Sequence, residues 1–269
     1  MSEEDKEKVS PVRKSLRRRT FVGQVGASTA LAATESAALQ SQLSREPQAP
    51  DWNAVASASQ EAFRIAVNEW IGRARVQGGR VSGATAFLTP GSLVSDINIE
   101  ARMVEIQSGS QQSSDTATRI ANVLAVSWNA WAAGFQMQIP EAYPRFRAVP
   151  GASAPPTRAA VTPALSQGTS AGETTLQAAA LARALLASLP ATTLRGRGKS
   201  ADAAMWRLAT WVDTSFNRWK NEVKLTGIIG KGSAATYAPP YVPVAPVTSG
   251  VNISAGPAFV GPRFGIVTP

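Results

Sequence analysis

The chain has 269 residues, with 27 lysines and arginines against 18 aspartates and glutamates, so its formal net charge is +9. It contains no cysteine and no histidine, which excludes disulfides, thiolate and imidazole metal sites, a cysteine nucleophile and a Ser-His-Asp triad. Hydrophobic residues make up 44% of the chain, which is enough for the core of a globular protein. No run of about 18 apolar residues occurs, so no transmembrane helix is predicted.

Residues 1–43 form a region that we interpret either as a basic N-terminal arm or as a cleavable export signal. The arginine pair Arg18 and Arg19 is followed by Thr20, Phe21 and then a mildly apolar run rich in small residues. This stretch, residues 15–38, resembles a twin-arginine export signal, which implies export of a folded protein to the periplasm or beyond. The alternative is an arm laid against a partner, in a cytoplasmic assembly or particle.

Residues 44–114 are predicted to form a first unit of helix and strand. Asp51 can cap a helix, and apolar residues at helical intervals predict that helix over residues 52–74. Residues 81–88 are predicted to be a strand that ends at a Pro-Gly pair. Residues 93–107 fit a helix or a strand, and we favour a strand because the apolar residues alternate.

Residues 115–199 are predicted to repeat this plan with a longer arm. A helix capped by Asp115 extends to about residue 135, and an alternating strand follows over residues 135–140. Prolines then recur from residue 140 to residue 163, which predicts an extended arm on the protein surface. A second, Ala- and Leu-rich helix is predicted to begin near Ser170.

Residues 200–269 are predicted to form the third unit, with a helix over residues 200–220, a strand over residues 223–229 and a proline-rich, apolar C-terminal arm. An arm so poor in charge would be adhesive if it were exposed. We therefore expect it to dock on its own fold or on a neighbouring subunit. The candidate interaction residues are Tyr237, Pro239, Pro240, Tyr241, Phe259 and Phe264.

The three predicted long helices end on one motif, an asparagine two residues before a tryptophan. The copies are Asn68 and Trp70, Asn129 and Trp131, and Asn217 and Trp219. This recurrence predicts an α+β fold built from degenerate internal repeats of a helix, a short strand and a proline-rich arm that wraps the core or a neighbouring subunit. We favour the tryptophans as core anchors, each burying on the order of 200 Å². The alternative is a row of rings that stack on sugars or on single-stranded bases.

No catalytic constellation is evident. The carboxylates are dispersed without a recurring pair, and no calcium-binding pattern occurs, so we predict neither enzymatic activity nor a cofactor or metal. We expect a structural or interaction protein, a subunit of a homo-oligomer or of a larger particle, filament or injection-type machine. The first alternative is an exported envelope or extracellular protein that binds polysaccharide through aromatic residues. The second is a nucleic-acid-associated particle protein that uses the basic N-terminal arm, with an acidic polymer as its partner.

Overall fold

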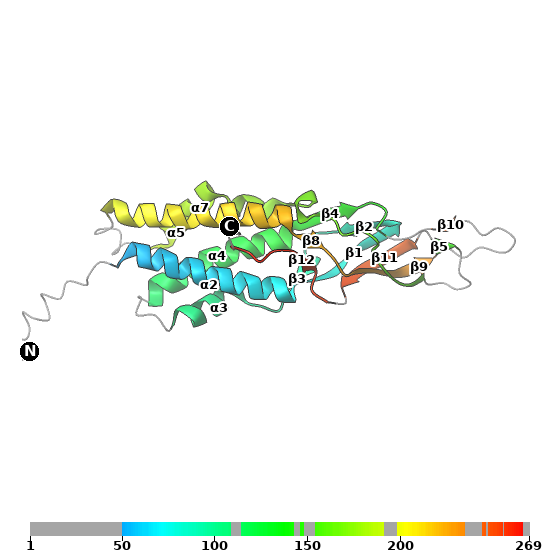
Figure 1. The fold of residues 1–269 in the computed structure, drawn as a ribbon, viewed down its shortest axis with the longest axis horizontal. Coiled ribbons are helices and arrows are strands. Elements are labelled where there is room, and N and C mark those ends of the chain that lie inside the picture. Colours follow the sequence, from blue (N-terminus) through cyan, green and yellow to red (C-terminus); the bar gives the residue numbers. More distant parts are fainter. Residues whose placement is uncertain are drawn as a thin grey trace, which may run out of the picture. The chain divides into compact units, whose positions relative to one another are not determined.

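Three long α-helices lie side by side, and each is followed directly by a β-strand (Figure 1). In this computed structural model the chain divides into two units, Met1–Gln48 and Ala49–Pro269, and all the described residues belong to the second. The described residues are 50–108, 114–142, 146–147, 154–190, 198–234, 244–245, 247–254 and 256–265. The long helices are α2 (Trp52–Arg73), α4 (Ser114–Gly134) and α7 (Gly198–Glu222).

Local sequence accounts for the start of α2. The Asp51 side chain accepts hydrogen bonds from the backbone N–H groups of Asn53 and Ala54, which gives an acceptor to two donors that have no partner inside the helix. Ala74 then takes an extended conformation, and the chain continues straight into a strand. The predicted helix over residues 52–74 is confirmed.

Four shorter helices complete the helical part of the described chain. They are α3 (Ile99–Gln107), α5 (Ala178–Ser188) and two 3₁₀ helices, η1 (Leu165–Gln167) and η2 (Ala171–Leu176). None of the helices in the described ranges has the length and apolar character that a membrane span requires.

The prediction of a strand over residues 93–107 was wrong. Only β3 (Leu93–Val94) is a strand, and α3 follows it. The Asn98 side chain caps α3 by accepting from the N–H of Ala101. Ile99, Met103 and Gln107 recur every four residues and are buried, so helical spacing and the cap outweigh the alternation that favoured a strand.

The fold is α+β, as predicted, and its sheet is antiparallel. The strands are β6 (Ala154–Arg158), β9 (Ile228–Ala234), β11 (Val247–Ser254), β1 (Arg75–Gly83), β2 (Thr85–Leu88), β4 (Phe135–Ile139) and β7 (Thr169–Ser170), in that order across the sheet. Strand β3 also pairs with β1. Two small sheets join β5 (Phe146–Arg147) to β10 (Val244–Ala245) and β8 (Lys224–Leu225) to β12 (Phe259–Val260).

Glycines divide the strands more finely than the sequence predicted. The single strand expected over residues 81–88 is a hairpin of β1 and β2, and β1 has a register shift between Gly78 and Val81. Gly78 and Gly79 have φ angles of 93° and 70°, which residues with a Cβ rarely adopt. Similarly, Gly227, at φ 67°, separates β8 from β9 within the stretch expected to be one strand.

Two of the predicted proline-rich stretches contribute strands to the sheet. Strand β6 is the terminal strand of the described order, where a proline without an N–H is tolerated. Strand β11 lies between β9 and β1, so this part of the C-terminal stretch is an internal strand and not an outer arm. Residues 247–254 contain no proline, and hence every residue of β11 has an N–H that can join the ladder.

The core between the long helices is a cluster of aromatic rings. Trp70, Trp131 and Trp219 are only 3%, 0% and 2% exposed. The Trp128 ring centroid lies 5.5 Å from that of Trp70, 4.9 Å from that of Trp131 and 5.6 Å from that of Trp219. The three repeated tryptophans therefore meet around one central ring, Trp128, and anchor α2, α4 and α7 to one another.

Candidate functional site

Burial removes the repeated tryptophans from the list of ligand-binding groups. Their rings face one another inside the protein, so they cannot stack on a sugar or on a base. The indole N–H groups of Trp128, Trp131 and Trp219 have no hydrogen-bond partner among the described residues, as in a packed apolar core. Trp206, which belongs to no repeat motif, is 43% exposed.

Seven of the other predicted residues lie outside the described part of the chain. They are Arg18, Arg19, Phe21, Tyr237, Pro239, Pro240 and Tyr241. The two that are described, Phe259 and Phe264, are 9% and 0% exposed and pack against the aromatic core of their own chain. This end of the C-terminal stretch therefore docks in cis.

Asn68 binds the backbone of Phe264. The Asn68 Nδ2 group donates to the Phe264 carbonyl at 3.1 Å, and the Phe264 N–H donates to Asn68 Oδ1 at 2.9 Å. The same Nδ2 group donates to the Arg64 carbonyl at 2.7 Å, which fixes the amide in place. One asparagine side chain thus satisfies both backbone groups of a residue 196 positions away in the sequence.

The neighbouring glycine allows this segment to come so close to the helices. Gly265 has a φ of 72°, and a Cβ there would lie 2.8 Å from the Trp211 ring and 3.1 Å from Arg64 Cγ. Arg64 is held in turn by Glu61, whose carboxylate accepts two hydrogen bonds from the guanidinium at 2.6 and 2.8 Å. These bonds lower the pKa of Glu61 and raise the pKa of Arg64.

Two further segments return from the sheet to the long helices. The Ser95 hydroxyl donates to the Trp70 carbonyl at 3.2 Å, and the Ser170 hydroxyl donates to the Trp131 carbonyl at 2.7 Å. Each segment then becomes helical, as α3 after Ser95 and as η2 and α5 after Ser170. We call these the two helical returns, in contrast to the non-helical C-terminal segment that Asn68 holds.

A groove of about 530 Å³ lies beside Asn129, between α4 and the first helical return. The Asn129 side chain is exposed and makes no hydrogen bond to another described residue. Val94 and Val126 line the groove with 36% and 58% of their surface exposed. The acidic residues Asp96 and Glu100 also line it. The groove therefore combines apolar surface, an open amide and negative charge.

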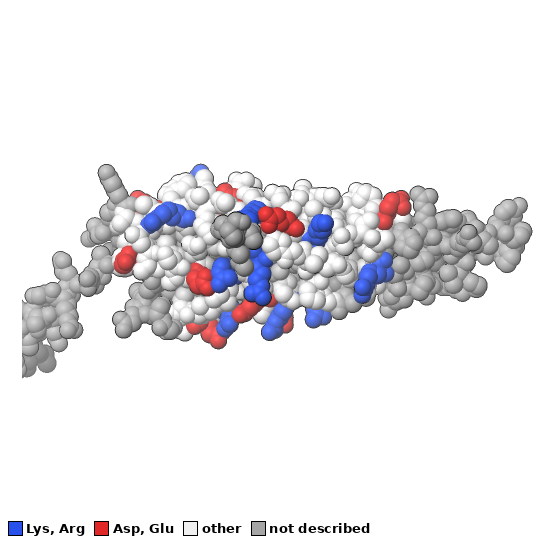
Figure 2. Space-filling model, viewed as in Figure 1, with Lys and Arg blue, Asp and Glu red and all other residues white. Residues whose placement is uncertain are grey.

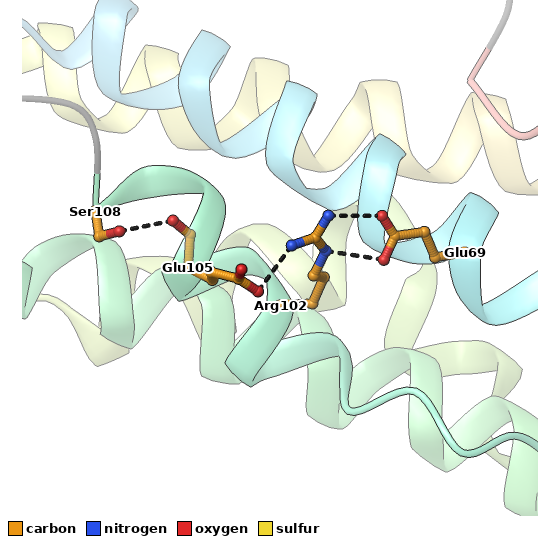
Figure 3. Close-up of polar contacts among 4 residues, drawn as sticks. All are labelled: Glu69, Arg102, Glu105 and Ser108. Carbon is orange, nitrogen blue, oxygen red and sulfur yellow. Dashed lines mark hydrogen bonds and ion pairs between the residues drawn. The ribbon is translucent and has the colours of Figure 1, made fainter.

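Ion pairs hold α3, which contributes Glu100 to this groove, against α2 (Figure 3). Arg102 on α3 donates two hydrogen bonds of 2.8 Å to the carboxylate of Glu69 on α2, and a third of 2.7 Å to Glu105. The hydrogen bonds to Glu69, and to a smaller extent the one to Glu105, raise the pKa of Arg102. The Ser108 hydroxyl donates to the Glu105 carbonyl at the end of α3. This bidentate geometry orients α3, the helix that carries Glu100.

A second groove, of about 470 Å³, lies beside Asn217, between α7 and the second helical return. It differs from the first because the amide of its asparagine already has a partner. Asn217 donates to Asp213 at 2.6 Å, and Asp213 also accepts from the N–H of Ala178 at 3.0 Å. Glu173 accepts two hydrogen bonds of 2.7 Å from Lys220.

The three repeated asparagines therefore occupy related places with different contents. Asn68 holds a peptide segment, Asn217 faces a groove with its amide engaged, and Asn129 faces a groove with its amide open. The motif predicted these positions, but it did not predict the groove-lining residues Val94, Val126, Asp96 and Glu100. Only the first helical return places Val94, Asp96 and Glu100 opposite α4.

Basic and acidic residues are interspersed on the face shown in Figure 2, and the described residues contain no group of three acidic side chains placed to hold a metal ion.

No protein-family model, no curated protein and no solved structure matches the chain.

Proposed function

We propose that this protein is a non-enzymatic structural or interaction protein, a subunit of a homo-oligomer or of a larger assembly such as a particle, filament or injection-type machine. The observation that carries the proposal is the difference among the three asparagine sites. The Asn68 site binds a peptide segment of the chain itself, and the grooves at Asn129 and Asn217 are open. A fold that uses one such site to hold a peptide offers two more to neighbouring subunits.

We also infer that the fold consists of three degenerate repeats, with boundaries near residues 44–114, 115–199 and 200–269. Pairing within each unit supports this. The residue five positions after each repeated tryptophan pairs antiparallel with a short returning strand, and the pairs are Arg75 with Val94, Gln136 with Thr169 and Lys224 with Val260. The same interval in three ladders is the pattern expected of a repeat.

Pairing between units supports the same division. One strand of each unit pairs with a strand of the next: β2 with β4, β6 with β9, and β11 with β1. The last pair joins the third unit back to the first, so the order is cyclic. Such an arrangement buries the hydrophobic face of each repeat against its neighbours.

The acidic side chains that line the grooves support a non-catalytic role. Glu173 pairs with Lys220, and Asp213 accepts from Asn217 and from a backbone N–H. Asp96 pairs with Arg73 at 3.2 Å, and Glu100 accepts from Asn122 at 3.1 Å. Each of these carboxylates thus has a structural contact.

Light scattering after size-exclusion chromatography of the full chain tests the proposal, together with mass spectrometry of partners that co-purify with the native protein. We expect a mass above that of the monomer, or stoichiometric partners. A monomer at all concentrations without partners would refute it.

Location follows from N-terminal sequencing of native material: removal of about the first 38 residues places the protein outside the cytoplasm, whereas an intact Met1 favours the arm.

A further inference from the structure

We propose that the groove beside Asn129 receives the segment Pro144-Arg145-Phe146 of a second copy of this chain, so that copies join head to tail. The inference rests on the proposed function, because it names the partner and the contact of one of its grooves. It follows from a tripeptide that occurs twice in the chain, from the equivalence of Asn68 and Asn129, and from the charge of the groove.

The tripeptide Pro-Arg-Phe occurs at residues 144–146 and again at residues 262–264. The second copy is the segment that Asn68 holds, through the backbone of Phe264. The Phe264 ring is fully buried, with its centroid 5.8 Å from that of Phe63 and 5.5 Å from that of Trp128. The chain therefore contains one Pro-Arg-Phe segment that is bound at an asparagine site and another with the same sequence.

The Asn129 groove matches such a segment better than the Asn217 groove does. The Asn129 amide makes no hydrogen bond to another described residue, so it can bind a peptide N–H and C=O as Asn68 does. Val94 and Val126 offer exposed apolar surface to a phenylalanine ring. Glu100 lines the groove and makes no ion pair with another described residue, so its charge complements an arginine, whereas Asp96 is already paired with Arg73.

The segment must come from a second copy, because Phe146, the described residue of the segment, lies far from the groove. Phe146 and Arg147 form β5, which pairs with β10 just beyond the end of β1 where Gly83 pairs with Val247. The groove residue Val94 pairs with Arg75 at the opposite end of β1. The nine residues of β1 separate these ends by about 27 Å, and Figure 1 shows β5 and β10 at the end of the sheet away from the helices.

A contact between two different surfaces of identical chains is heterologous, so it extends into a ring or a filament instead of closing a twofold dimer. This gives a sharp test. The variants Asn129→Ala and Phe146→Ala each lose one of the two surfaces, and each should raise the dissociation constant of self-association about tenfold or more. An equimolar mixture of the two retains one intact groove and one intact segment, so it should form a 1:1 dimer that cannot extend.

Light scattering at matched concentrations measures both effects, and thermal unfolding checks that each variant is folded. Asn221→Ala is the matched control, because this exposed asparagine on α7 lines neither groove, and it should leave self-association unchanged. If Phe146→Ala does not fold, Arg145→Glu replaces it. It should weaken self-association to a similar degree, and combining it with Glu100→Lys should restore the contact by exchanging the two charges.

The outcomes separate this inference from the proposed function. Self-association of the wild-type chain that is equally strong in the Asn129→Ala and Arg145→Glu variants would overturn the inference and leave the assembly role standing. A monomeric wild-type chain without partners would refute both. A dimer in the mixture, absent from either variant alone, is the expected result.

Discussion

Replacing Phe264 by alanine tests the docking of the C-terminal segment. The ring is fully buried and lies within 5.5–6.3 Å of four other aromatic rings, measured between centroids. Removing a buried phenylalanine side chain from a core costs about 3–5 kcal/mol, from lost transfer free energy and from the cavity left behind. For a unit of this size the unfolding midpoint should fall by roughly 6–20 °C.

Equilibrium urea unfolding, followed by tryptophan fluorescence, measures this loss directly. Four of the seven tryptophans of the chain, Trp70, Trp128, Trp131 and Trp219, report on the cluster that the segment covers. Val260→Ala is the control: Val260 lies on the same segment but is 53% exposed, so the change should stay within about 0.5 kcal/mol. A loss below about 1 kcal/mol for Phe264→Ala would refute cis docking of the segment on the aromatic core.

Three further perturbations probe other contacts. Gly172→Ala should destabilise the protein by about 1–3 kcal/mol in the same urea assay, because the new Cβ would clash with the carbonyl oxygen of Ala130 on α4 and overpacking forces the backbone to move. Unchanged stability would contradict the close approach of η2 to α4. Lys220→Ala should cost about 1–3 kcal/mol, since it leaves the partly buried Glu173 carboxylate without its partner, whereas Lys220→Arg should recover part of this. Arg64 lowers the folded-state pKa of Glu61, so the pair stabilises the protein only while Glu61 is ionised. The difference in unfolding free energy between wild type and Arg64→Gln should therefore be complete above the ordinary glutamate pKa of about 4.3 and vanish as the pH falls through the lower folded-state pKa. A difference that grows in acid would contradict this role of the pair.

Much of the helical architecture could be predicted from the sequence because its causes are local. The cap at Asp51, the four-residue spacing of buried side chains in α2 and the repeated Asn-x-Trp ends all act within a few residues. The place of the tryptophans in the core also followed from their size and from their recurrence at the ends of amphipathic helices. The same local reasoning missed α3, where the apolar residues fit both a strand and a helix and the cap at Asn98 favours the helix.

The contents of the three asparagine sites depended on the tertiary structure. The amide groups of Asn68, Asn129 and Asn217 have the same chemistry and the same local motif, so the sequence distinguished none of them. What differs is the segment that returns from the sheet: one is non-helical and reaches Asn68, and the other two turn into helices and leave grooves. These contacts join residues up to 196 positions apart, and only the packing of the whole chain decides which distant segment meets which helix. The sequence by itself determined the three long helices, their tryptophan anchors and the absence of cysteine and histidine chemistry. The tertiary structure decided which surfaces stayed open, because the segment that covers a helix comes from a distant part of the chain.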